Sequence, residues 1–491
     1  MDLGNVVSLV VSAVLVANII LAGLVVFIER RDVGTTWAWL MVLLFVPTVG
    51  FVVYLFFGRR FRPSSYLNLS REEKMYLDTA VDRQILQLKQ TRYFGEPLLE
   101  KHSDLLLMNL KANNALLTLD NEIRIFYDGR EKFEALFADI RAAKREINLQ
   151  YYIIRGDALG KRLRDELLRK AQEGVKIRIL YDEVGSKRLP RSFFRSLEEC
   201  GAEVAVFFPS HLRLVNFRIN NRNHRKLCVI DGEIAYLGGF NVGDEYLGLS
   251  KKFGNWRDTH LRIQGGAVRQ ILGRFLLDWG EATRHRPGLE PPVNQAGETG
   301  QERFGSRGGT SAVQVIASGP HSQTEHIKNM YIKLIATAKT SVFVQTPYFI
   351  PDASFMDACK IALLAGVDLR IMIPDKPDHP FVYWATWAYA GELLSFGARI
   401  LLYKKGFLHA KTIVADREVA SVGTANIDMR SFKLNFEVNA LIYDQNIAGE
   451  LYDAFLRDSR DCVELTPELY GGRSLQIRFK EAVSRLLSPI L

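Results

Sequence analysis

Two short stretches of the chain carry side chains suited to phosphodiester chemistry. They are His224-Arg-Lys226-Leu-Cys-Val-Ile-Asp231 and His409-Ala-Lys411-Thr-Ile-Val-Ala-Asp416. Residues two positions apart on a strand share a face, so each stretch should present an imidazole beside an ammonium group. The ammonium would neutralise phosphoryl oxygens, and the imidazole would attack phosphorus or transfer a proton. Two copies therefore supply a nucleophile on one side and an acid on the other.

The match between the two stretches continues downstream. A glycine and an asparagine follow each histidine at the same spacing, 14 and 17 residues on: Gly238 and Asn241, and Gly423 and Asn426. Five residue types at identical spacing indicate a duplicated site. We expect Asn241 and Asn426 to donate hydrogen bonds to the phosphoryl oxygens of a substrate.

A histidine with this role needs an acceptor on its second ring nitrogen, which fixes the tautomer and stabilises the charged ring. The candidates are Asp258 and Glu437, each of which begins an apolar strand downstream of a motif; the alternative for both is an ordinary charge at a strand edge. Asp231 and Asp416 stand at the edge of a turn, where we expect them to orient loops or the motif lysines. The predicted catalytic set is His224, Lys226, Asp231, His409, Lys411 and Asp416.

The elements that must position these residues also repeat. Residues 150–157 and 345–352 are apolar strands that lead into helical patterns, and strand-like stretches after Gly174 and Gly366 follow them. Gly201 and Gly397 precede a third pair. This order predicts two duplicated α/β domains with mixed, largely parallel sheets. We place them at 113–285 and 311–491, joined by a Pro- and Gly-rich linker at 286–310.

The N-terminal part of the chain has two long stretches without charge. They predict transmembrane helices at about 5–28 and 35–57, within an uncleaved hairpin of residues 1–62. The alternative is two buried core helices. Arg59, Arg60 and Arg62 follow the second stretch, so we place both termini in the cytoplasm. Residues 63–112 are charge-rich, with a helical pattern over 70–93, and are interpreted as a membrane-proximal linker or cap.

Composition limits the remaining possibilities. The chain has 491 residues, 48% of them hydrophobic and 24% charged, which excludes a disordered protein. Its formal net charge of +9 favours anionic partners without choosing among nucleic acid, acidic lipid and phosphorylated substrates. The four cysteines are too scattered for a disulfide framework or a zinc site. No glycine-rich nucleotide-binding loop or His-carboxylate metal motif is found, so we expect no cofactor and no metal.

The last helical stretch, residues 474–487, is basic and amphipathic. It suits an anionic membrane surface, and equally a last helix that packs on the second domain.

The duplicated His-x-Lys motif with its Gly and Asn block resembles the signature of the phospholipase D superfamily. Within it, the two N-terminal spans, residues 424–437 and the Ser-Pro-Ile-Leu end resemble bacterial cardiolipin synthases, over nearly the whole chain. The resemblance implies two phospholipase D-like domains behind a membrane hairpin, in a phosphatidyltransferase of the bacterial inner membrane with cytoplasmic catalytic domains. Its implied partners are phosphatidylglycerol and anionic membrane lipid, without nucleic acid.

The resemblance also implies a two-step reaction. One histidine, His224 by analogy with relatives, takes the phosphatidyl group from phosphatidylglycerol and releases glycerol, while His409 acts as acid and then as base. The hydroxyl of a second phosphatidylglycerol then gives cardiolipin. A membrane-bound hydrolytic phospholipase D, or another phosphatidyltransferase, would use the same residues. A nuclease suits the net charge but leaves the hairpin unexplained.

Overall fold

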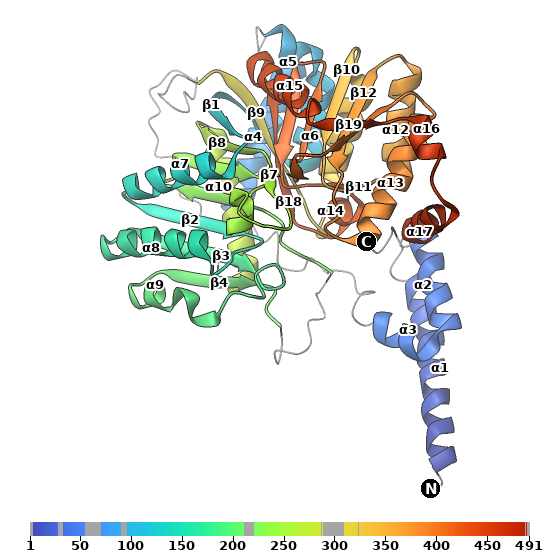
Figure 1. Cartoon of the computed structure of the whole chain (residues 1–491). Helices are drawn as coiled ribbons and strands as arrows, with labels where there is room; N and C mark the ends of the chain where they lie inside the picture. Colours follow the sequence, from blue (N-terminus) through green and yellow to red (C-terminus); the bar gives the residue numbers. More distant parts are fainter. Residues whose placement is uncertain are drawn as a thin grey trace. The chain divides into compact units, whose positions relative to one another are not determined.

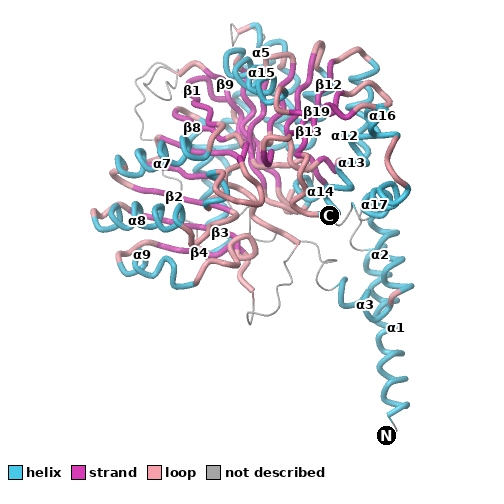
Figure 2. The backbone as a smooth tube through the Cα atoms, viewed as in Figure 1, coloured by secondary structure: helices cyan, strands magenta, loops and turns pink. Residues whose placement is uncertain are grey.

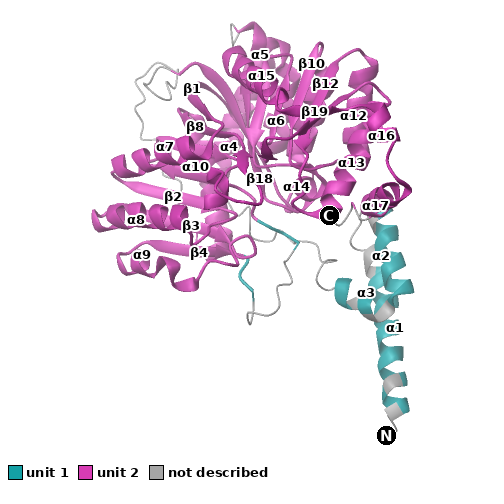
Figure 3. Cartoon of the chain, viewed as in Figure 1, with its two compact units in different colours: residues 1–63, 208–222 teal, residues 64–207, 223–491 magenta. Residues whose placement is uncertain are grey.

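The computed structural model describes residues 3–27, 33–54, 70–89, 96–210, 220–285, 287, 309–322, 324–486 and 488. The chain divides into two compact units, shown in different colours in Figure 3. One comprises residues 1–63 and 208–222, and the other comprises residues 64–207 and 223–491. The predicted linker at 286–310 lies outside the described residues, apart from residues 287, 309 and 310.

The N-terminal apolar stretches form three helices: α1 (Leu3–Phe27), α2 (Val33–Phe45) and α3 (Pro47–Val53). Within the described residues, Gly4–Gly23 in α1 is the stretch long and apolar enough to cross a membrane. The second span was predicted as one helix over 35–57. This prediction is wrong, because the described residues 35–54 are divided between α2 and α3. Residues 55–57 lie outside the described part. Proline has no N–H to continue a helix, so Pro47 starts a new one. A Cβ on Gly50 would lie 2.4 Å from the carbonyl oxygen of Val42, so α3 folds back onto α2.

The segment before the first predicted domain is helical where the structure describes it. It contains α4 (Arg71–Lys89), α5 (Pro97–Lys101) and α6 (Ser103–Asn113). Leu99, Leu105 and Leu106 share a hydrophobic core with Met330 and Leu334 from the second half of the chain. Asn109 also donates to the side chain of Gln314 at 3.1 Å. The described part of this segment is therefore packed into the core, while its proximity to a membrane stays a prediction.

Each half of the remaining chain supplies strands to one 15-stranded sheet. The first half contributes β1 (Leu117–Phe126), β2 (Glu146–Tyr151), β3 (Lys176–Asp182), β4 (Glu203–Phe207), β5 (Leu227–Ile230), β6 (Ile234–Gly238) and β8 (His260–Gln264). The second half contributes β9 (Ser311–Ser318), β10 (Ser341–Gln345), β12 (Asp368–Pro374), β13 (Arg399–Tyr403), β15 (Thr412–Ala415), β16 (Val419–Gly423), β18 (Glu437–Tyr443) and β19 (Cys462–Leu465).

The strand order shows the predicted duplication. From the centre outward the first half runs β1-β8-β6-β5-β2-β3-β4, and the second runs β9-β18-β16-β15-β10-β12-β13 with β19 added at the edge. The halves join through the antiparallel pair β1 and β9. The sheet is mixed, as predicted, but it is not largely parallel, because the four parallel pairs in it are β2–β3, β3–β4, β10–β12 and β12–β13. Parallel pairs need long crossovers, whereas β5 and β6 join through a three-residue turn, as do β15 and β16.

Helices cover the sheet in both halves (Figures 1 and 2). Those of the first half are α7 (Gly129–Ala142), α8 (Ala158–Gln172), α9 (Arg195–Glu199) and α10 (Ala267–Thr283). Those of the second half are α11 (His326–Thr337), α12 (Ala353–Leu364), α13 (Pro380–Leu394), α14 (Met429–Lys433), α15 (Gln445–Ser459), α16 (Pro467–Gly471) and α17 (Leu475–Leu486). Strands buried on both faces read as continuous apolar runs, as in Ile413–Ala415 of β15.

Candidate active site

The motif histidines and lysines lie in short extended segments directly before two matching strands. Lys226 precedes β5, and Lys411 precedes β15, so the pairs stand at the strand entrances rather than within the strands as expected. β5 and β15 occupy equivalent places in the two halves of the sheet. The duplicated fold therefore places the two His-Lys pairs at equivalent positions in the two halves.

Each histidine is held by a carboxylate from the other half. Nδ1 of His224 lies 2.9 Å from Oε1 of Glu437, and Nδ1 of His409 lies 2.6 Å from Oδ2 of Asp258. Both carboxylates were predicted from the sequence, but each was assigned to the motif that precedes it in its own half. The structure crosses them, so each histidine centre is assembled from both halves.

Backbone pairing between the halves explains the crossing. β14 (Gly406–Leu408) pairs in parallel with β7 (Asn255–Arg257), and the N–H of His409 donates to the carbonyl oxygen of Arg257 at 2.7 Å. At the other centre the N–H of His224 donates to the carbonyl oxygen of Phe436 at 3.0 Å. Each contact places a histidine beside the residue just before the partner carboxylate.

The two carboxylates are fully buried and have different supports. Glu437 accepts from the hydroxyl of Thr424 at 2.5 Å and from the amide of Asn435 at 3.2 Å. Asp258 accepts from the backbone N–H of Thr259 at 2.8 Å. Burial alone would raise the pKa of both carboxyl groups, but the hydrogen bonds that they accept and the neighbouring basic side chains outweigh burial and lower it. Both groups are therefore ionised and able to orient an imidazole.

Burial depresses the pKa of the bases that face these carboxylates. Burial, together with repulsion from the charge of Lys411, lowers the pKa of His409 to about 3. Burial also lowers the pKa of His224. The pKa of Lys226 falls to about 7 and that of Lys411 to about 8, for the same reason. The histidines are thus neutral at pH 7, with Nδ1–H given to the carboxylate and Nε2 left as the basic nitrogen.

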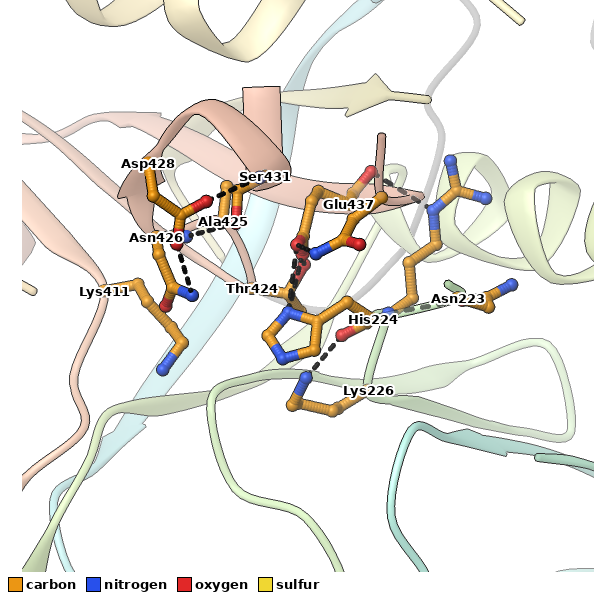
Figure 4. Close-up of polar contacts among 12 residues, drawn as sticks. Asn223, His224, Lys226, Lys411, Thr424, Ala425, Asn426, Asp428, Ser431 and Glu437 are labelled. Atoms are coloured by element: carbon orange, nitrogen blue, oxygen red, sulfur yellow. Dashed lines mark hydrogen bonds and ion pairs between the residues drawn. The ribbon is translucent and has the colours of Figure 1, made fainter. Parts of the chain in front are cut away.

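The two His-Lys pairs act on one another electrostatically, as expected for one shared site. Lys411 lowers the pKa of His224, and Lys226 lowers the pKa of His409. In Figure 4, Lys411 and Asn426 extend from the second half toward the region of His224 and Lys226. The ammonium groups of both lysines donate to the carbonyl oxygen of the histidine two residues earlier, which fixes their direction.

The two predicted phosphate-binding asparagines differ in their contacts. Oδ1 of Asn241 accepts from the N–H of Ile153 at 3.1 Å, and its amide donates to Tyr246 at 3.3 Å. The amide of Asn426 donates to Asp428 at 3.2 Å, while its buried Oδ1 has no hydrogen-bond partner. Asn426 therefore offers an acceptor to the site, where a donor was predicted.

The motif aspartates lie apart from the histidines. Asp231 accepts hydrogen bonds from the backbone N–H groups of Lys144, Arg145 and Glu146 at 2.7–2.9 Å. Asp416 does the same with residues 339–341, at 2.7–3.0 Å. These segments enter β2 and β10, the strands next to β5 and β15. The contacts match the expected loop-orienting role. They do not bring either carboxylate to a histidine or lysine of the two motifs.

A set of buried and partly buried charged residues behind the site was not predicted from the sequence. The Arg225 guanidinium contacts Asp278 at 2.5 Å and the carbonyl oxygen of Glu437 at 3.1 Å. Arg257 contacts Asp458 at 2.8 Å and the carbonyl oxygen of Asp258. A signal was present, because an aspartate follows each orienting carboxylate by 20 or 21 residues.

Equivalent glutamines join both clusters. Gln150 donates to Asp278 at 2.6 Å, and Gln345 donates to Asp458 at 2.8 Å. They occupy matching positions on β2 and β10. In the described part of the chain, no group of three or more His, Cys, Asp or Glu side chains is arranged to hold a metal ion.

Comparisons with known proteins agree with this site. Residues 136–253 and 331–459 match the family described as cardiolipin synthase, phospholipase D-like domain, and residues 16–59 match a phospholipase D-nuclease N-terminal family. The chain is 52% identical over 483 residues to a cardiolipin synthase of Listeria welshimeri, covering 97% of this chain and 98% of that one. It is 51% identical over 490 residues to the major cardiolipin synthase of Bacillus subtilis, covering 99% of both.

The fold is also found in a solved structure. The phosphatidylserine synthase of Haemophilus influenzae Rd KW20 superposes with a TM-score of 0.62 at 16% identity, covering 79% of this chain and all of that one. These findings confirm the predicted fold class and enzyme class, and the N-terminal match with its apolar helix indicates membrane association. The chain belongs to the cardiolipin synthase family of phospholipase D-like proteins.

Proposed function

We propose that this chain makes cardiolipin and glycerol from two molecules of phosphatidylglycerol through a phosphatidyl-histidine intermediate. The observation that carries the proposal is the pair of histidines, each oriented through Nδ1 by a buried carboxylate. Two buried lysines accompany them, and each acts electrostatically on the histidine of the other motif. Family membership supports the choice of product.

In the first step, Nε2 of His224 attacks the phosphorus of one phosphatidylglycerol. The P–N bond forms as the bond from phosphorus to the glycerol oxygen breaks, and His409 gives that oxygen a proton. Lys226 and Lys411 neutralise the phosphoryl oxygens as charge develops. Burial and the charges of both lysines oppose protonation of His409 in the empty site, and the negative charge of a bound substrate favours it.

In the second step, a terminal hydroxyl of another phosphatidylglycerol attacks the phosphorus. His409 takes the hydroxyl proton, the P–N bond breaks and His224 is restored. The unpartnered Oδ1 of Asn426 suits an acceptor alcohol, because a hydroxyl can donate to it and a phosphate anion cannot. One phosphodiester is exchanged for another, so the proposed reaction needs no nucleotide.

The same proposal places the protein in the bacterial inner membrane as an integral protein. In this proposal α1 crosses the bilayer, and the second apolar stretch as a whole returns the chain to the cytoplasmic side, ahead of Arg59, Arg60 and Arg62 in the sequence. The unit of residues 64–207 and 223–491, which contains the motif histidines and which we call the catalytic unit, is then cytoplasmic. Cys200, which is exposed, should react with a membrane-impermeant maleimide in inverted vesicles and be protected in intact spheroplasts.

The deciding experiment is to incubate the detergent-purified full chain with phosphatidylglycerol alone and to quantify lipids and glycerol together. We expect cardiolipin with one glycerol released for each molecule formed. Phosphatidic acid in place of cardiolipin would identify a hydrolase with the same catalytic residues. No consumption of phosphatidylglycerol would contradict the proposed donor, and His224→Ala protein provides the inactive control.

A further inference from the structure

Helix α17 packs on the catalytic unit with its polar side inward. Glu481 and Ser484 are only 4% and 1% exposed, and Ser488 beyond the helix is 3% exposed. Glu481 faces Arg473 at 3.2 Å, and the Ser488 hydroxyl lies 3.0 Å from that of Tyr389 on α13. These contacts fix which face of the helix points away from the protein.

The outward face of α17 is apolar. Leu475, Phe479 and Leu486 are 82%, 70% and 80% exposed, and Ala482 between them is also exposed. Spacings of four, three and four residues place all four side chains along one stripe of a helix. A soluble helix normally buries such a stripe, so this helix is oriented opposite to an ordinary surface helix.

Basic residues flank the stripe. Arg478, Lys480 and Arg485 are exposed on α17, and the one acidic residue of the helix, Glu481, is on the buried side. Contacts with the protein hold two of these basic side chains: Arg485 binds Glu392 at 2.6 Å, and Arg478 donates to the carbonyl oxygen of Gly471 at 2.6 Å. Glu392 offsets the charge of Arg485, so Arg478 and Lys480 supply the positive charge beside the stripe. An apolar stripe with positive charge on its edges is complementary to an anionic lipid surface.

The neighbouring helix extends this surface. Lys480 lies 5.5 Å from the ring centre of Trp384, near the start of α13, and one turn earlier Phe381 is 47% exposed. Aromatic side chains of this kind favour the boundary between lipid headgroups and acyl chains. We name the apolar stripe of α17 (Leu475, Phe479, Ala482 and Leu486), together with Phe381 on the neighbouring helix, the α17 patch.

We propose that the α17 patch inserts into the surface of an anionic bilayer and docks the catalytic unit on it, independently of the N-terminal helices. The charge at its edges selects lipid over a second copy of the chain, whose own α17 patch carries the same positive charge. The side chains would reach about 5–10 Å into the headgroup and acyl boundary. The proposal does not depend on the reaction, because it concerns binding alone.

The test uses the full chain in nanodiscs, with an environment-sensitive fluorophore on a single cysteine. Cys200 and Cys462 are replaced by serine, the buried Cys228 and Cys359 remain, and Phe479→Cys is labelled. In nanodiscs of phosphatidylcholine with phosphatidylserine, we expect a blue-shifted emission that spin labels on the lipid acyl chains quench. Phosphatidylserine supplies the charge without the proposed substrate.

Cys200 is the matched control. It is exposed at the end of α9, on the opposite side of the catalytic unit from α17 (Figure 1), and the N-terminal helices tether it equally. Its fluorophore should show neither shift nor quenching. The double variant Arg478→Gln with Lys480→Gln should weaken the quenching at residue 479 in anionic nanodiscs and leave it unchanged in phosphatidylcholine alone.

Two outcomes would overturn the proposal. Emission at residue 479 that matches the water-exposed control in anionic nanodiscs would show that the patch stays in water. A blue shift without quenching by lipid spin labels would show that protein covers the patch, either a second copy or another part of this chain. Neither outcome depends on whether the enzyme makes cardiolipin, so failure here is separable from failure of the proposed function.

Discussion

The two histidine centres each pair a histidine with a buried carboxylate, but the groups that support the carboxylate differ. His224 relies on a glutamate that a threonine and an asparagine support, and His409 relies on a shorter aspartate supported by a backbone N–H. Each carboxylate comes from the opposite half. Duplication therefore gave two equivalent positions, and the crossed carboxylates keep either half from forming a complete centre alone.

A second difference lies in the two motif asparagines. Both the oxygen and the nitrogen of the Asn241 amide form hydrogen bonds, whereas the amide oxygen of Asn426 has no hydrogen-bond partner. We infer that the first half holds the phosphatidyl group and that the second half handles the two alcohols in turn.

Replacement of either histidine should have the largest effect. His224→Ala and His409→Ala should each lower cardiolipin formation by about 10⁴-fold or more, because one removes the nucleophile and the other the general acid. A substrate with a p-nitrophenolate leaving group separates the two roles, since this group departs without a proton. His409→Ala should then still release a burst of p-nitrophenol, whereas His224→Ala should not.

The reverse pattern, with a burst from His224→Ala alone, would exchange the two roles and leave the paired mechanism intact. A burst from both variants would contradict the phosphatidyl-histidine intermediate. Both proteins should keep the melting temperature of the unmodified chain within a few degrees, since His224 and His409 stand at the solvent side of the buried carboxylates.

The crossed carboxylates offer the next largest effect. Glu437→Gln and Asp258→Asn keep the side-chain shape but lose the charge that orients the imidazole, so each should lower turnover by about 10²-fold to 10⁴-fold. In the p-nitrophenyl assay Glu437→Gln should abolish the burst, as His224→Ala does. Asp258→Asn should retain it, as His409→Ala does. The crossed pairing would be refuted if Glu437→Gln gave the same burst result as His409→Ala, and Asp258→Asn the same as His224→Ala.

The sequence predicted the parts of this site that depend on local spacing. His224, Lys226, His409 and Lys411 repeat at fixed intervals, so their pairing required no knowledge of the fold. The crossing of Asp258 and Glu437 depends on backbone contacts between segments about 150–210 residues apart, as in the β7–β14 pair. Hydrophobic periodicity carries no information about such contacts.

Two other features escaped prediction for different reasons. The sheet was expected to be largely parallel because strands and helices alternate early in each half, but the later strands connect by tight turns and pair antiparallel. The second apolar stretch is long enough for one span, yet Pro47 divides it where α3 folds back onto α2. Apolar length alone does not report a break of this kind.

The lysines should make anion binding depend on pH. Their pKa values of about 7 and 8 lie below the ordinary value of 10.5, so above pH 8 both lose their charge in the empty site. A soluble phosphonate analogue with one constant charge should bind with proton uptake, and its affinity should fall by up to about tenfold per pH unit for each neutral lysine. Titration calorimetry in buffers of different ionisation enthalpy measures both quantities.

Single replacements sharpen the comparison between the lysines. In Lys226→Met the decline in affinity should begin near pH 8, where Lys411 titrates. In Lys411→Met it should begin above pH 7, because repulsion from Lys411 no longer depresses the pKa of Lys226. An affinity that does not change between pH 7 and 9 in the unmodified protein would contradict charged lysines as the anion-binding groups.

The asparagines should separate the two steps with a smaller effect. Asn426→Ala removes one acceptor for the incoming alcohol and should raise the KM for the acceptor by about 2-fold to 10-fold, with the p-nitrophenol burst unchanged. Asn241→Ala removes contacts to Ile153 and Tyr246 in the half that we infer to hold the phosphatidyl group, and it should slow the burst itself. If Asn426→Ala slowed the burst as much as Asn241→Ala, the division of roles between the halves would be wrong.

The motif aspartates should affect stability more than catalysis. Asparagine in Asp416→Asn tolerates the left-handed backbone at this position, φ 54°, but a backbone N–H then faces an amide NH₂, which should cost about 1–3 kcal/mol in the free energy of unfolding.

This effect should depend on pH. Backbone donors outweigh burial and lower the pKa of Asp416, so its stabilisation is present above the pKa of the unfolded state and is lost as pH falls through the pKa of the folded state. Melting temperatures of the two proteins should therefore converge in acid, while kcat at pH 7 stays within about twofold. A loss of kcat as large as that in Asp258→Asn, with an unchanged melting temperature, would return Asp416 to the catalytic set and show that the halves divide their work differently.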